Sequence, residues 1–215
     1  MGAYYSAVRL LASGFLGTLT GWEVRGRAHV PRKGGLIVAA NHISFWDPPL
    51  IGGALPREMH FLAKEELFRT PLLGPLIRSV NSIPIRRGVA DMSGLARAME
   101  TLRGGSALLM FPEGSRMRDG ELHPARPGVG MMAVNADVPI VSCYISGSNR
   151  QRQWLTRGAR VRVWFGPVRP WRDLVGPEDD LTPGRALYQR VGEAVMREIA
   201  ILKTGQQTTA SRGAA

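Results

Sequence analysis

The sequence has a single cysteine among its 215 residues, and it lacks several familiar catalytic motifs. One cysteine excludes an internal disulfide and a cysteine-based metal site, which suits a reducing compartment. The four histidines lack the H-E-x-x-H spacing of zinc hydrolases, and no G-x-S-x-G elbow offers a nucleophilic serine. Cys143 itself lies in an apolar stretch without a basic neighbour, so it is not a promising nucleophile.

Long uninterrupted apolar runs are also missing, which bears on the N-terminal segment. A transmembrane helix needs about 20 strongly apolar residues, whereas Arg9 and two glycines interrupt this stretch. It can be an ordinary helix packed on the domain, or a helix lying in a bilayer interface with Tyr4, Tyr5 and Trp22 as interfacial aromatic residues. We expect a membrane-associating helix over residues 1–21.

Acidic residues are scarce, with 17 against 28 basic ones, and the net charge is +11. Nucleic acid, an anionic membrane surface and phosphorylated substrates are all suitable partners for such a charge. The basic residues are scattered, and the sequence shows neither a stacking-aromatic motif nor a nucleic-acid fold signature. We therefore expect no nucleic-acid partner.

Short apolar runs alternate with helical patterns along the rest of the chain. Strands are predicted at 22–27, 35–41, 58–64, 82–87, 106–111, 138–147 and 159–168. Helices are predicted at 48–55, 66–80, 90–105, 127–136 and 181–202. Strands separated by helices indicate an α/β fold, here a mixed, largely parallel sheet flanked by helices on both faces.

Domain boundaries follow from the same patterns. Residues 22–203 are expected to form one α/β domain, and the polar residues 204–215 a disordered tail. Apolar and polar residues alternate in 159–168, which predicts a half-exposed edge strand.

Polar residues follow two of the buried strands, Asn41 and His42 after one and the sequence FPEGSR (111–116) after the other. Ligands of open α/β sheets bind at the carboxyl ends of strands, so we expect these loops to meet. Pro48 favours a strand-to-helix turn at Asp47, where the carboxylate can accept the imidazole N–H of His42. The other imidazole nitrogen is then free to remove a proton.

A simpler alternative makes Asp47 a helix N-cap and His42 an ordinary strand-end residue. If the pair is instead a base, the lack of a protein nucleophile suggests that it activates a substrate hydroxyl directly.

Four sequence blocks resemble those of the glycerolipid acyltransferases of the lysophosphatidic acid acyltransferase type. The blocks are NHISFWD (41–47), similar to NH-x4-D; NSIPIRRG (81–88); FPEGSR (111–116), similar to FPEGTR; and VPIVSCYISG (138–147). The segment 61–80 is similar to the family's connecting segment, and the resemblance covers about residues 35–150 in the expected order.

The resemblance implies that His42, oriented by Asp47, deprotonates the hydroxyl of a lysophospholipid, most simply 1-acyl-sn-glycerol-3-phosphate. The hydroxyl oxygen would attack the thioester of acyl-CoA or acyl carrier protein without an acyl-enzyme intermediate, and no metal or cofactor would be needed. Residues implied in binding the acceptor phosphate and its surroundings are Arg87, Glu113, Gly114, Ser115 and Arg116, with Asn41, Arg86, Arg126 and Pro139 as further candidates.

The resemblance also implies a hydrophobic acyl-chain tunnel and attachment to the cytoplasmic face of the cell membrane. The chain departs from the family's pattern at Arg86, where other residues are common, and at Arg126, where a lysine is usual. Its N-terminal segment is short for a two-helix anchor. A lyso-aminolipid acceptor and a lipid-binding protein without catalysis are alternatives, and the motifs leave open the donor, the acyl-chain length and the oligomeric state.

Overall fold

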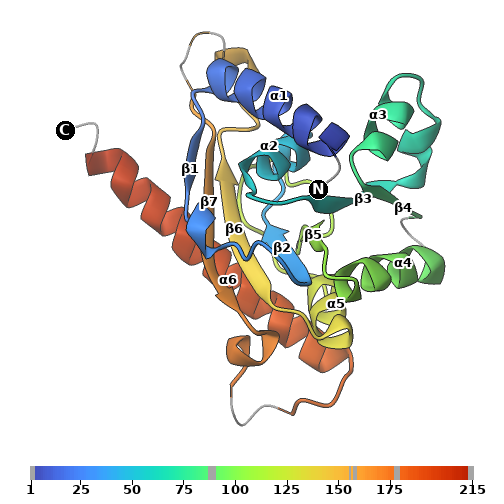
Figure 1. Ribbon diagram of the computed structural model, residues 1–215. Coiled ribbons are helices and arrows are strands. Elements are labelled where there is room, and N and C mark those ends of the chain that lie inside the picture. Colours follow the sequence, from blue (N-terminus) through green and yellow to red (C-terminus); the bar gives the residue numbers. More distant parts are fainter. Residues whose placement is uncertain (1–2, 87–90, 155, 157–158, 177–179, 213–215) are drawn as a thin grey trace.

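The computed structural model describes residues 3–86, 91–154, 156, 159–176 and 180–212 (Figure 1). Its centre is a sheet with strand order β1-β7-β6-β2-β5-β3-β4. The strands are β1 (Glu23–Arg25), β2 (Leu36–Ala40), β3 (Met59–Lys64), β4 (Ser82–Ile85), β5 (Ala107–Met110), β6 (Ile140–Ser146) and β7 (Arg162–Arg169). All neighbouring strands run parallel except β6 and β7.

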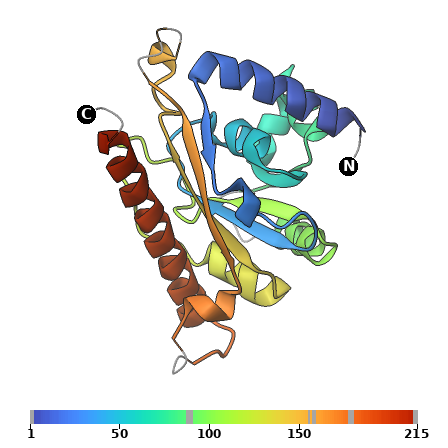
Figure 2. The same ribbon diagram turned by 60° about the vertical axis from the view of Figure 1, so that its left-hand side comes forward.

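Helices cover both faces of this sheet, as the turned view in Figure 2 shows. The α-helices are α1 (Ala3–Thr20), α2 (Asp47–Ala54), α3 (Leu73–Ser79), α4 (Met92–Arg103), α5 (Gly128–Ala136) and α6 (Arg185–Arg212). Alternate residues of β2 face two separate apolar clusters, one with α1 and α2 and the other with α4, α5 and α6. Burial on both faces explains why this strand is apolar throughout, and the predicted fold class is confirmed.

One short 3-10 helix and one break interrupt the regular pattern before α3. The segment predicted as one helix at 66–80 is a 3-10 helix, Glu65–Arg69, followed by α3. Thr70, Pro71 and Leu72 separate them, and Leu72 has a positive φ of 65°. Other 3-10 helices are Arg27–His29, Gln151–Gln153 and Trp171–Leu174.

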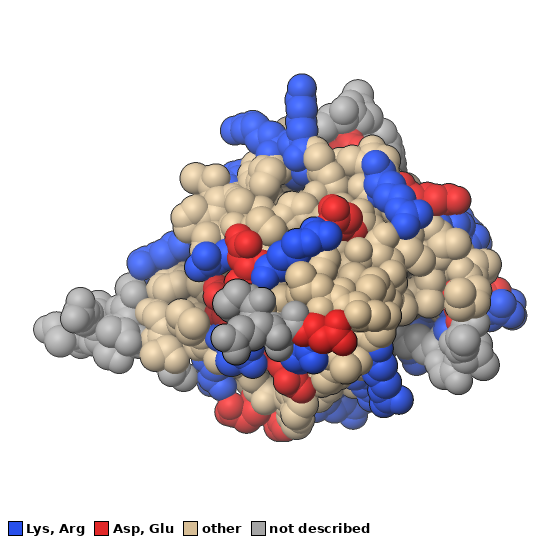
Figure 3. All heavy atoms as spheres, turned by 90° about the horizontal axis from the view of Figure 1, so that it is seen from below, with Lys and Arg blue, Asp and Glu red and all other residues tan. Residues whose placement is uncertain are grey.

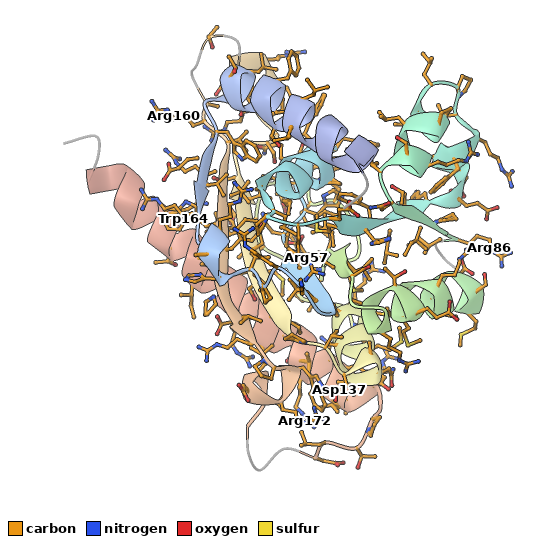
Figure 4. All side chains as sticks on the ribbon, viewed as in Figure 1. Arg57, Arg86, Asp137, Arg160, Trp164 and Arg172 are labelled. Carbon is orange, nitrogen blue, oxygen red and sulfur yellow. The ribbon has the colours of Figure 1, made fainter. Side chains whose placement is uncertain are left out.

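The prediction that β7 is a half-exposed edge strand is wrong. β1 pairs with β7 in parallel and takes the edge position. Trp164, which the alternation in 159–168 groups with the polar residues Arg160 and Arg162, is only 9% exposed, and Gly205 of α6 lies next to its ring. Figure 4 shows Trp164 between the β7 region and α6. The alternation of polar residues did not reveal this cover because α6 supplies it from the far end of the chain.

The predicted disordered tail is also corrected, since α6 continues to Arg212. Gly205 packs closely on Trp164, and Gln206 is buried and accepts a hydrogen bond from the Ser146 hydroxyl at 2.7 Å. These contacts hold a polar sequence in a helix. Residues 213–215 lie outside the described part of the chain.

Helix α1 packs on α2 with one face and leaves an apolar face uncovered. Leu16 is buried, and the Ser13 hydroxyl donates to the Gly53 carbonyl at 3.2 Å. Leu10, Leu11 and Phe15 are 64%, 75% and 68% exposed. No helix in the described ranges combines the length and apolar character needed to cross a membrane.

Candidate active site

The loops that follow β2 and β5 meet above the sheet, as predicted from the order of the strands. β2 and β5 are parallel neighbours, so their carboxyl ends lie at the same edge. The Met117 N–H donates to the His42 carbonyl at 2.7 Å, and the His42 N–H donates to Oε2 of Glu113 at 2.9 Å. These bonds fix the backbone on both sides of the imidazole.

His42 and Asp47 form a close pair in the turn between β2 and α2. Nδ1 of His42 lies 2.8 Å from Oδ2 of Asp47, and the side chains are 13% and 0% exposed. The same Oδ2 accepts the backbone N–H groups of Ile43 and Ser44, each at 2.7 Å. These donors precede α2, and Trp46 rather than Asp47 is its N-cap residue. The N-cap alternative is therefore not what the structure contains.

The imidazole plane of His42 is fixed by stacking on Phe111, with ring centroids 3.9 Å apart and planes 14° from parallel. The bond from Nδ1 to the carboxylate makes Nδ1 the protonated nitrogen. Nε2 has no hydrogen-bond partner within the described residues. The arrangement is thus an oriented imidazole with one nitrogen available to accept a proton.

Glu113 holds the two loops together from a buried position. Glu113 is 2% exposed, and its two side-chain oxygens accept the backbone N–H groups of His42 (2.9 Å) and His123 (3.2 Å). Burial raises the pKa of this carboxyl, while the two N–H groups oppose that rise. Each oxygen accepts one backbone N–H group, so Glu113 holds the loop after β2 against the loop after β5.

Asn41 also acts on the backbone. Its amide donates to the Ile145 carbonyl at 3.0 Å, and its side-chain oxygen accepts the Ile145 N–H at 2.8 Å. The asparagine thereby extends the pairing of β2 with β6 by one residue, which fixes the start of the turn that carries His42.

The other residues of the third block lie beside the site. Gly114 has φ 73°, a left-handed backbone conformation that favours glycine, and the Arg126 side chain lies close to its α-carbon. Ser115 is half-buried and Arg126 is exposed. The guanidinium of Arg116 lies 4.5 Å from the ring centroid of Phe45, a residue of the same turn as His42 that is 62% exposed.

Three other predicted site residues are not seen beside His42: Pro139 and Arg86 lie elsewhere, and Arg87 is not described. Pro139 precedes β6, at the opposite edge of the sheet, where its carbonyl accepts the Ile37 N–H. Arg86 follows β4, three strands from β2, or about 14 Å at the usual strand spacing; Figure 4 shows it at the far side of the molecule. Arg87 lies outside the described residues.

Arg86 has acidic neighbours of its own. Its guanidinium lies 3.9 Å from Glu65 and 3.8 Å from Asp91, and its N–H donates to Asp91 at 2.8 Å. This N–H, followed by that of Gly94, lowers the pKa of Asp91 to about 2.

The sequence patterns missed Ser148 and Gln151, which follow β6. The Ser148 hydroxyl donates to Oδ1 of Asp47 at 2.5 Å, and the Gln151 amide donates to the Ser44 hydroxyl at 2.9 Å. The available signal was the placement of β6 beside β2, which brings its carboxyl end to the same edge of the sheet.

Neither a metal-binding cluster nor a cysteine nucleophile is found in the described part of the chain. It contains no group of three or more His, Cys, Asp or Glu side chains that could hold a metal ion. Cys143 is fully buried, and burial, followed by the charge of Asp47, raises the pKa of its thiol well above the usual range. A buried neutral thiol does not serve as a nucleophile.

Comparison with known proteins gives a consistent picture. The family model described as Acyltransferase matches residues 21–146. A 1-acyl-sn-glycerol-3-phosphate acyltransferase of Bacillus subtilis is 24% identical over 176 residues, which cover 80% of this chain and 87% of that protein. A lyso-ornithine lipid O-acyltransferase of Pseudomonas aeruginosa is 36% identical over 126 residues, which cover 58% of this chain and 48% of that protein.

A solved structure shares the whole architecture. The crystal structure of the 1-acyl-sn-glycerophosphate acyltransferase PlsC from Thermotoga maritima matches with a TM-score of 0.71 and 28% sequence identity. The match covers 93% of this chain and 79% of that one. The family match contains His42, Asp47 and the third block, which are the residues gathered at the sheet edge. The chain belongs to the acyltransferase family and is an acyltransferase of the lysophosphatidic acid acyltransferase type.

Proposed function

We propose that the protein transfers a fatty acyl group from acyl-CoA or acyl carrier protein to the free hydroxyl of a lysophospholipid. The preferred acceptor is 1-acyl-sn-glycerol-3-phosphate, and the product is phosphatidic acid. The observation that carries this proposal is the buried pairing of His42 Nδ1 with Asp47 at 2.8 Å, which leaves Nε2 available. The names of the Bacillus and Thermotoga relatives support the choice of acceptor.

In the proposed reaction, Nε2 of His42 removes the hydroxyl proton while the hydroxyl oxygen attacks the thioester carbonyl. The tetrahedral intermediate then expels the thiolate, which takes the proton from Nε2 of His42 and leaves as a thiol, so the imidazole is neutral again. Asp47 holds the imidazole in the required tautomer and stabilises the positive charge that it gains. No bond forms between the acyl group and the protein.

The phosphate of the acceptor is assigned to arginine side chains. Arg116 lies on Phe45 at the mouth of the site, and a guanidinium can bind phosphate through two parallel hydrogen bonds. Arg87, which matches the family's second block, is proposed as a further phosphate contact. Glu113 is not, because both of its oxygens accept backbone N–H groups.

A lyso-aminolipid is the second candidate acceptor. The Pseudomonas relative is named for a lyso-ornithine lipid, and it shares 36% identity over 126 residues. The carboxylates of Glu65 and Asp91 near the second block do not add to this support, because they are paired with Arg69 and Arg86.

Attachment to the cytoplasmic face of the membrane is proposed to occur through the outer face of α1. Leu10, Leu11 and Phe15 are exposed there, and burial of apolar area contributes about 25 cal/mol per Å². The chain's charge of +11 adds attraction to anionic lipid. The face seen in Figure 3 is the one turned away from α1, and there Lys and Arg are interspersed with Asp and Glu.

Point variants test this attachment better than removal of α1, because Leu16 belongs to the core. The double variant Leu11→Gln/Phe15→Gln should release the protein from anionic vesicles at high salt, where charge attraction is screened. Leu76→Gln, which changes an exposed residue of α3, is the matched control. Undiminished sedimentation of the double variant with vesicles would refute attachment through α1.

The reaction itself is tested with purified protein in detergent, a panel of lyso-lipids, and acyl-CoA or acyl carrier protein as donor. The expected outcome is acylation of 1-acyl-sn-glycerol-3-phosphate in preference to lyso-ornithine lipid and other lyso-aminolipids. Preference for a lyso-aminolipid would establish the second candidate. Thioester hydrolysis without transfer to any lyso-lipid would contradict both.

A further inference from the structure

The turn that follows β6 reaches the His42–Asp47 pair from a third strand. Ser148 is completely buried, and its hydroxyl donates to Oδ1 of Asp47 across 101 positions of sequence. The residue follows the fourth sequence block and belongs to none of the four. Its contact with Asp47 is therefore a feature of the fold that the motifs do not contain.

The two oxygens of Asp47 have unequal environments. Oδ2 accepts three N–H groups, those of the His42 imidazole and of the Ile43 and Ser44 backbone. Within the described residues, Oδ1 has one donor, the Ser148 hydroxyl at 2.5 Å. Because Asp47 is 0% exposed, water cannot replace that donor without a rearrangement.

The hydroxyl is held in place by its own surroundings. Gly147 has φ 78°, and a β-carbon there would collide with the Arg160 carbonyl, so the turn has little freedom to shift. Trp154 donates to the Gly147 carbonyl at 3.0 Å. The Gln151 amide bridges the Ser148 carbonyl (2.8 Å) and the Ser44 hydroxyl (2.9 Å), which ties the β6 turn to the β2 turn.

We propose that Ser148 is a positioning residue of the acyl-transfer reaction. Its hydroxyl fixes the second oxygen of Asp47, so that the carboxylate keeps its bond to His42 Nδ1 and the imidazole keeps Nε2 directed at the acceptor. The contact stabilises the negative charge that Asp47 must hold while the imidazole is protonated. This proposal rests on the proposed function of His42 as the base.

Removal of the hydroxyl is the first test. Ser148→Ala should lower kcat by about tenfold to a hundredfold, the range expected when a buried acceptor loses its donor. Both KM values should stay within about twofold, because Ser148 acts on Asp47 and not on a substrate. The matched control is Ser146→Ala, which removes the hydroxyl of the last residue of β6, two positions before Ser148, that donates to Gln206 at 2.7 Å. Its kcat should be unchanged.

Ser148→Cys provides a second variant that keeps the shape of the side chain with a somewhat larger atom and replaces the hydroxyl with a weak donor. We expect its kcat to fall by about fivefold or more, with the same KM values. This variant decides the question if Ser148→Ala does not fold. A wild-type kcat in either folded variant would overturn the proposal.

A double-mutant cycle separates action through Asp47 from general damage. The rate of acyl transfer is measured by single turnover with excess enzyme. In an Asp47→Asn background, Ser148→Ala should lower this rate by less than about a further threefold. A full multiplicative loss would show that Ser148 does not act through Asp47, and would overturn the proposal while leaving the base intact. The base itself fails on a separate result, normal turnover of folded His42→Ala.

Discussion

The described residues include two His–Asp pairs in two different regions, and the distance within each pair does not distinguish them. His42 and Asp47 lie 2.8 Å apart in the turn after β2, and His123 and Asp119 lie 2.7 Å apart in the loop after β5. The side chains of the first pair are 13% and 0% exposed, and those of the second are 40% and 53% exposed. Only the first pair is excluded from water.

The surroundings of the two carboxylates explain what each pair can do. Asp47 accepts backbone N–H groups from Ile43 and Ser44 and a hydroxyl from Ser148, so it is fixed in one orientation. Asp119 accepts its other hydrogen bond from the Glu121 N–H at 3.1 Å and is otherwise open to water. A hydrogen bond in water contributes little, whereas a buried and fully satisfied one can hold an imidazole for catalysis.

The imidazoles give the largest expected contrast. His42→Ala should lower turnover by about 10²–10⁴-fold, because it removes the general base. His123→Ala should stay within about threefold of wild type, because an exposed pair contributes little. Turnover is measured at saturating donor and acceptor, with circular dichroism to confirm folding. Equal losses in the two variants would mean that the difference in surroundings has no catalytic meaning.

The carboxylates should show the same contrast on a slightly smaller scale. Asp47→Asn should be nearly as severe as His42→Ala, with a loss of about 10²-fold or more, because an amide favours the wrong imidazole tautomer. Asp119→Asn should leave kcat essentially unchanged. The measurement is kcat for both, and near-normal activity of Asp47→Asn would refute the orienting role.

Two arginines on the chain between the pairs sharpen the comparison further. Arg116 lies on Phe45 of the first region, and Arg118 is exposed beside Asp119. Arg116→Ala should raise the acceptor KM by about tenfold or more, and Arg116→Lys should not fully restore the wild-type KM. Arg118→Ala serves as the control. A change confined to the KM of the thioester donor would show that Arg116 does not bind the acceptor.

The smallest expected effect is on the pH dependence of the free energy of unfolding. The hydrogen bond from His123 is the largest cause that lowers the pKa of Asp119 below its ordinary value of 3.8. The unfolded carboxyl then binds its proton more tightly, so this contribution is present above about pH 4 and is lost as the pH falls further. Asp119→Asn should therefore flatten the fall of unfolding free energy below pH 4, measured by urea titration.

Glu113 accepts the N–H groups of His42 and His123 and so joins both regions. Its effect on the pH dependence of stability should be opposite to that of Asp119. Burial raises its pKa above the ordinary value of 4.5. The folded state then binds more protons than the unfolded state just above pH 4.5, so this group makes stability fall as the pH rises through that interval. Glu113→Gln should therefore weaken the fall of unfolding free energy as the pH rises above 4.5. A Glu113→Gln variant that instead weakens only the fall below about pH 4, as expected for Asp119→Asn, would contradict this account.

Local sequence was sufficient for the strands and for the His42–Asp47 pair. Continuous apolar runs marked the buried strands, and Pro48 placed Asp47 in a turn. What the sequence could not provide were contacts between distant segments. Ser148 meets Asp47 only because β6 pairs with β2, and Trp164 is covered only because α6 returns to it. The contacts of Glu113 could not be predicted for the same reason, since its partners are backbone groups 71 and 10 residues away.

The central claim is that His42 acts on the acceptor hydroxyl directly, in a single displacement. The most direct test is to incubate wild-type protein with an acyl thioester in the absence of acceptor and to record its intact mass. The account predicts an unmodified protein, with acyl transfer beginning only when lysophospholipid is added. A protein that carries one acyl group and passes it to lysophospholipid added later would contradict the account.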